Sequence, residues 1–118
     1  MIFVLFEVTV KPEGLKEYFS LAAGLKGELD RAEGFVRSER FTSLAHEGKV
    51  LSLSVWESEE AVEKWRNLFQ HRVSQRKGHD ALFESYTISV ASAIRSYTLT
   101  DRAETPGDSK AFFAASGA

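Results

Sequence analysis

Trp65, His71 and Arg72 are the residues of this chain whose types and spacing could do chemistry on an aromatic molecule. An imidazole titrates near neutral pH, so His71 could act as a general base that removes a phenolic proton. In a straight helix Arg72 returns to nearly the same face as Trp65, where its guanidinium could hold the resulting anion. In a straight helix His71 projects about 120° away from Trp65, so Arg72 shares a pocket with Trp65 more readily unless the helix breaks near Phe69. We take His71 and Arg72 as the predicted catalytic residues and Trp65 as the stacking ring.

Each of these residues also has a purely structural interpretation. Trp65 lies on the apolar stripe of its helix and could be a core aromatic instead of a ring that lines a pocket. His71 could be a surface or capping residue. Arg72, Arg76 and Lys77 form a local basic cluster, which could be a solvated helix face or a clamp for an anionic ligand. The sequence alone leaves both interpretations open.

Two further aromatic residues are candidates for the same pocket. Trp56 ends a predicted strand on the face that otherwise carries serines. It could anchor a subunit interface or form a pocket wall, and we favour the interface. Tyr86 and Tyr97 could each donate to an oxygen in a pocket or simply pack on the sheet. We take Trp56 and Tyr86, with Trp65, as the predicted substrate-binding residues.

The histidines show no metal-ligand pattern. His46, His71 and His79 have no recognised spacing, and His46 and His79 are predicted to lie in a turn and a loop. No phosphate-binding glycine loop, dinucleotide fingerprint or Ser/His/Asp order is present. We therefore expect no metal site and no tightly bound flavin, nicotinamide or iron.

Composition limits the remaining possibilities. The chain has 118 residues, enough for one domain with a single core, and its net charge is -2. That balance gives no general attraction to nucleic acid or to an anionic membrane. Cysteine is absent, which excludes disulfides, thiolate metal sites and a cysteine nucleophile and agrees with a cytoplasmic location. No window has the ~18 apolar residues that a membrane span needs.

Hydrophobic periodicity predicts the order of the elements. Residues 2–10 alternate between two faces as a strand does, and helical spacing of apolar residues follows Pro12 to about residue 30. Strands are predicted over residues 35–43 and 49–57. A helix capped by Ser58 comes next, and a long final strand covers residues 83–100. We expect residues 1–100 to form one domain and residues 101–118 to be a partly mobile tail.

The order β-α-β-β-α-β predicts an α+β, ferredoxin-like fold with a four-stranded antiparallel sheet and both helices on one face. The other face would then be uncovered. Exposing apolar area costs about 25 cal/mol per Å², so pairing of two such faces is favoured. The sequence therefore predicts a homodimer.

Several short segments resemble the antibiotic biosynthesis monooxygenase (ABM) family. They are VWESEEAVEKWRN, QHRVSQRKG, ALFESY and a final RSY, and upstream EGFVRSERFTS with LSLSVWES extends the resemblance to about residues 2–98. The resemblance implies a dimeric α+β barrel. It also implies either a cofactor-independent oxygenase that acts on quinols or polycyclic anthrones, or a heme-degrading enzyme.

The heme-degrading branch can be compared residue by residue. That branch has an asparagine on its first strand, a helix tryptophan and an iron-binding histidine ten positions after the tryptophan. Trp65 matches the tryptophan, but Gln75 stands ten positions later and Glu7 occurs on a first strand without asparagine. Glutamine is a poor axial ligand beside imidazole. Heme degradation is therefore our second alternative.

The leading hypothesis is a small cofactor-independent monooxygenase that acts on a quinol or related electron-rich aromatic. Trp65 would stack on the substrate, and His71 or Arg72 would promote and stabilise its anion, which then reduces oxygen directly. The first alternative is a non-catalytic ligand-binding or regulatory dimer that uses the same cavity.

Overall fold

The computed structural model describes the backbone of residues 1–74 and 82–115, and the side chains of residues 1–70 and 82–112. The elements are β1 (Ile2–Val10), a 3₁₀ turn η1 (Pro12–Gly14), α1 (Leu15–Asp30), β2 (Phe35–Thr42), β3 (Lys49–Trp56), α2 (Glu59–Ser74), β4 (Phe83–Ser92) and α4 (Gly107–Ala115).

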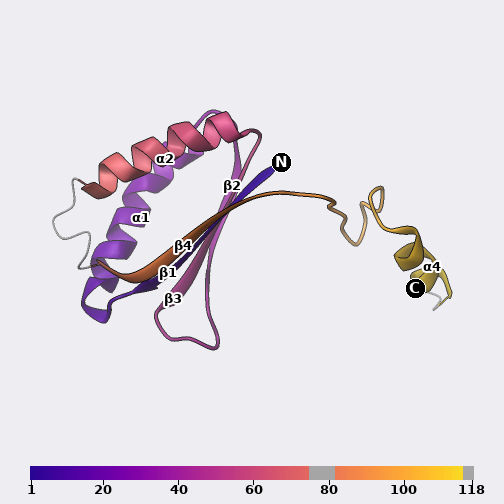
Figure 1. The fold of residues 1–118 in the computed structure, drawn as a ribbon, viewed down its shortest axis with the longest axis horizontal. Coiled ribbons are helices and arrows are strands. Elements are labelled where there is room, and N and C mark those ends of the chain that lie inside the picture. Colours follow the sequence, from indigo (N-terminus) through magenta and orange to yellow (C-terminus); the bar gives the residue numbers. More distant parts are fainter. Residues whose placement is uncertain (75–81, 116–118) are drawn as a thin grey trace.

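The four strands form one antiparallel sheet in the order β2-β3-β1-β4. Both α1 and α2 lie on the same side of this sheet (Figure 1). This arrangement confirms the predicted α+β, ferredoxin-like fold. The two central strands, β1 and β3, carry the face on which the helices pack.

Strand alternation places one face of β1 in the core. Val8 and Val10 of β1 are almost completely buried, and Ile2, Val4 and Phe6 pack against buried clusters on the same face. One cluster forms around Val8, Tyr18 and Phe83, and another forms around Trp56, Ala61 and Val62. The core is thus concentrated toward the two ends of the helix–sheet layer, with Leu21 and Leu25 between them.

The predicted start signals of α1 and α2 are confirmed. Pro12 opens η1, where its missing N–H costs nothing, and α1 follows directly. The backbone N–H of Ala61 donates to Ser58 Oγ over 3.2 Å, so Ser58 caps the start of α2. Glu59 and Glu60 then place negative charge in the first turn, where the helix dipole favours it.

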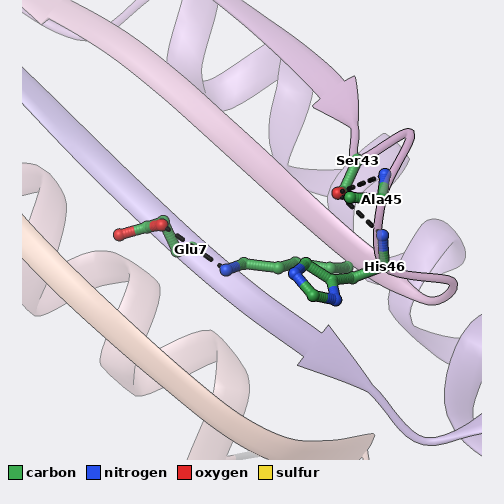
Figure 2. A network of polar contacts seen from close by, with 5 residues as sticks. Glu7, Ser43, Ala45 and His46 are labelled. Atoms are coloured by element: carbon green, nitrogen blue, oxygen red, sulfur yellow. Dashed lines mark hydrogen bonds and ion pairs between the residues drawn. The ribbon is translucent and has the colours of Figure 1, made fainter.

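The β2–β3 hairpin has its own polar network (Figure 2). Ser43 Oγ accepts hydrogen bonds from the backbone N–H groups of Ala45 and His46, over 3.2 and 3.0 Å. Gly48 ends the turn with φ of 80°, a conformation that glycine adopts without strain. His46 therefore lies in a turn, as predicted.

The last strand is shorter than predicted. β4 ends at Ser92, which pairs with Ile2, and Ala93 N–H donates to the Met1 carbonyl. This hydrogen bond is the last one that the structure describes between β4 and β1. Residues 94–100 lead away from the sheet toward α4 (Figure 1), and Tyr97 lies outside the strand.

We predict that Gly34→Ala destabilises the fold, whereas Gly24→Ala does not. Gly34 has φ of 79°, and a Cβ there would lie 2.7 Å from the Cβ of Ala61. We expect a loss of about 1–3 kcal/mol in the free energy of unfolding. Gly24 is a helical position with open space around it, so alanine there should add about 0.5–1 kcal/mol. Urea unfolding measures the free energy of unfolding of both variants. An equal loss of stability in Gly24→Ala and Gly34→Ala would contradict this prediction.

Candidate functional site

A cavity of about 400 Å³ lies between the sheet and the two helices. This volume falls in the usual range for small-molecule sites. Its lining residues come from all four strands, α1 and α2: Val4, Phe6, Tyr18, Leu21, Ala22, Leu25, Lys26, Leu29, Ser38, Glu39, Arg40, Ser52, Ser54, Val62, Trp65, Arg66, Phe69, Ile88 and Val90.

The floor of the cavity is two rows of residues that cross the sheet from β2 to β4. The strand register gives one row as Arg40, Ser52, Phe6 and Ile88, and the other as Ser38, Ser54, Val4 and Val90. Directly paired residues of antiparallel strands point to the same face. The floor is therefore polar on the β2 and β3 side and apolar on the β1 and β4 side.

The roof of the cavity is apolar and aromatic. Leu21 and Leu25 of α1 are buried, and Trp65 and Phe69 of α2 pack against them. Phe69 also meets the floor, because its ring lies edge-on to Phe6 with centroids 5.9 Å apart. These contacts form an apolar, aromatic wall suited to a planar ligand. The structure thus confirms that Trp65 belongs to the helix's apolar stripe and also places it on the cavity.

Trp56 is a core residue on the helix-facing side, so the preferred expectation of a subunit-interface anchor is wrong. Its side chain is 0% exposed, it pairs across the sheet with Ile2, and its ring lies 6.1 Å from that of Trp65. The indole Nε1–H donates to Ser54 Oγ over 2.8 Å. Trp56 therefore does not line the cavity itself but supports two residues that do, Trp65 and Ser54.

Tyr18 is a cavity residue that the sequence did not single out. It is 4% exposed, and its ring packs edge-on against Phe83. Burial raises the pKa of the Tyr18 phenol above its ordinary value of 10.0, and the nearby Arg40 guanidinium partly offsets this. The phenol is therefore neutral at physiological pH and can donate a hydrogen bond to a ligand oxygen.

The remaining predicted site residues are only partly placed. Tyr86 is on the helix-facing side of β4 but is 51% exposed and lies outside the cavity lining, where its ring contacts Phe6 and Phe83. The backbone of His71 and Arg72 belongs to α2, while their side chains lie outside the described residues. Residues 75–81, which include Gln75 and His79, also lie outside the described part of the chain.

The described part of the chain offers neither a metal-binding cluster nor a membrane-spanning helix. Among the residues that the structure describes, no group of three histidine or acidic side chains could hold a metal ion. None of the helices in that part of the chain is long and apolar enough to cross a membrane.

The chain is a small α+β domain with a cavity between its two helices and its sheet. The sequence model described as antibiotic biosynthesis monooxygenase matches residues 1–77, and the chain belongs to this family. The family assignment made from the sequence segments is thereby confirmed.

Three known proteins illustrate the relationship. The chain is 36% identical over 90 residues to the jasmonate monooxygenase ABM of Pyricularia oryzae. The matched residues make up 76% of this chain and 42% of that protein. The chain thus spans less than half of that relative. It is 28% identical over 92 residues to the uncharacterized protein YqjZ of Bacillus subtilis, covering 66% of this chain and 80% of that protein. SnoaB of Streptomyces nogalater, a cofactor-independent oxygenase, has a similar fold with a TM-score of 0.67 at 19% identity, covering 84% and 96% of the two chains.

We predict that substitution by valine destabilises the fold at Ser54 but not at Ser52, two serines of the cavity floor. Ser54→Val leaves the Trp56 indole N–H buried without an acceptor, which should cost about 1–3 kcal/mol. Ser52 has no such role, and valine favours a pleated strand, so Ser52→Val should be neutral or gain up to about 1 kcal/mol. Chemical unfolding of both variants tests this difference. Equal losses would show that the indole hydrogen bond does not distinguish the two sites.

Proposed function

We propose that the chain is a cofactor-independent monooxygenase that binds a quinol or related electron-rich aromatic in the cavity. The observation that carries this proposal is the combination of an aromatic roof at Trp65 with neutral hydroxyl donors at Tyr18 and Ser54. Membership of the monooxygenase family and the fold shared with the cofactor-independent oxygenase SnoaB support it.

The chemistry requires the substrate to supply the electrons. Loss of a phenolic proton gives an anion that transfers an electron to oxygen, and the resulting radicals combine. A quinol plus O₂ then gives a hydroxylated quinone plus water, so one oxygen atom enters the ring and the other is reduced. The apolar walls would keep water from the radical pair. In this scheme His71 accepts the proton, and Arg72 stabilises the anion.

Homodimerisation is part of the proposal. The face of the sheet opposite the helices carries the half-buried side chains of Phe3, Leu5, Leu51 and Leu53. Phe41 extends this apolar surface on β2 and is 43% exposed. A second copy that packs against the same face would remove this area from water.

We predict that Leu53→Glu shifts the protein from dimer to monomer, because the change places a charge at the centre of this face. Leu44→Glu is the matched control, since Leu44 is fully exposed in the hairpin turn. Sedimentation velocity at micromolar concentration measures both. A wild-type monomer, or a Leu53→Glu dimer, would refute the interface.

We predict that the protein accelerates oxygen uptake with 1,4-dihydroxynaphthalene, and that the variant His71→Ala/Arg72→Ala loses most of this rate. Removing a general base typically lowers the catalytic rate by about 10²–10⁴-fold. His46→Ala is the control, because His46 lies in the hairpin turn. An oxygen electrode and mass spectrometry with ¹⁸O₂ provide the readouts.

The same assay separates the enzyme from its main alternative. Ligand binding without oxygen uptake by the wild-type protein would favour the non-catalytic ligand-binding dimer. An unchanged rate in the double variant would remove His71 and Arg72 from the mechanism while leaving the oxygenase itself intact.

A further inference from the structure

The polar end of the cavity floor is centred on Arg40. This residue lies in the same cross-sheet row as Ser52, and the neighbouring row holds Ser38 and Ser54. Adjacent strands are about 4.8 Å apart, so this end lies roughly 10–14 Å from the apolar side chain of Ile88 across the sheet. A ligand that spans the floor would therefore have one polar and one apolar end.

The charge of the cavity is positive. Lys26, Arg40 and Arg66 line it, and Glu39 is the acidic residue among the described lining residues. Strand alternation pairs Glu39 with Leu53, on the face away from the helices. The ion pairs found in the described part of the chain join Lys49 to Glu7 and Lys64 to Glu33. The three cavity cations therefore have no described carboxylate as a salt-bridge partner.

Arg40 is also held in place at the cavity. Its guanidinium carbon lies 5.8 Å from the ring centroid of Phe19, which is half exposed at the edge of α1. This contact restricts the side chain of Arg40, and among the described residues no hydrogen bond from its guanidinium is found. A guanidinium binds a carboxylate through two parallel hydrogen bonds, and the hydroxyls of Ser38 and Ser52 lie beside it in the register.

A phosphate is a poorer match to this end of the cavity. Phosphates are commonly held by free backbone N–H groups at helix N-termini or glycine-rich loops. Ser38 and Arg40 lie within strand β2 and Ser52 lies within strand β3, so none of them belongs to a helix N-terminus or to a glycine-rich loop. A single fork-shaped donor beside neutral hydroxyls fits a carboxylate monoanion better.

We propose that the electron-rich aromatic substrate also carries a carboxylate and is therefore an amphiphilic acid, with its carboxylate on Arg40 and its apolar ring between Trp65 and the β1–β4 half of the floor. This inference rests on the proposed use of the cavity as the substrate site, and it names the class of substrate. It makes Arg40 a specificity-determining residue that does not take part in electron transfer to oxygen.

Isothermal titration with 2-naphthoic acid and its neutral amide, 2-naphthamide, tests the proposal at pH 7.5 without requiring turnover. We expect the wild-type protein to bind the acid at least about tenfold more tightly than the amide. Arg40→Gln should abolish this preference and leave amide binding nearly unchanged, which also shows that the cavity is intact. Arg40→Lys should retain part of it, since lysine keeps the charge but not the fork.

Arg37→Gln is the matched control. Arg37 lies on the same strand but pairs with Val55, so its loss should leave the affinities for both probes unchanged. Equal binding of acid and amide, failure of both to bind, or an equal effect of the Arg37 and Arg40 variants would overturn the inference. Preference for the acid without any oxygen uptake would refute the oxygenase but support the carboxylate site. Oxygen uptake without preference for the acid would refute the carboxylate site but support the oxygenase.

Discussion

The site depends on one feature of the sheet, the placement of two small polar residues under the helices. Ser52 and Ser54 lie opposite Phe6 and Val4 in the β1–β3 register. At these positions a ferredoxin-like sheet would ordinarily present large apolar side chains to its helices. Because serine fills less space, the layers meet mainly at their two ends, through the clusters around Val8 and Trp56. The cavity is the volume left between them.

The hydrogen bond from Trp56 to Ser54 connects this cavity to the rigid core. Trp56 is enclosed by Phe35, with ring centroids 5.4 Å apart, and by Trp65. The indole N–H occupies one acceptor position of the serine oxygen, so the Ser54 hydroxyl proton can serve as a donor to another group. The same bond therefore satisfies a buried polar group and orients one on the floor.

Periodicity predicted the elements well, but it could not assign the faces of β3. Alternation placed Trp56 with Ser52 and Ser54, and serines ordinarily indicate a solvated face. Only the pairing of Trp56 with Ile2 shows that this face is covered by helices. The end of β4 was missed for a similar reason, since alternation continues past Ser92 while its partner strand does not. No local sequence pattern marked Arg40 or Tyr18 as a cavity residue, because only tertiary packing brings β2 and α1 together.

If the substrate supplies its own electrons, the protein has little chemistry left to perform beyond binding, proton removal and exclusion of water. Under the two proposals above, the part of the cavity that serves the reaction is the apolar half with Trp65 and Phe69, and residues of β2 and β3 select the substrate. These roles lie on different strands, and β2 is an edge strand whose residues contribute little to the buried core. Substitutions at Ser38 or Arg40 can therefore change the substrate without disturbing the packing on which the reaction depends. This separation is a physical reason for one fold to accept chemically different substrates while keeping one type of oxygen chemistry.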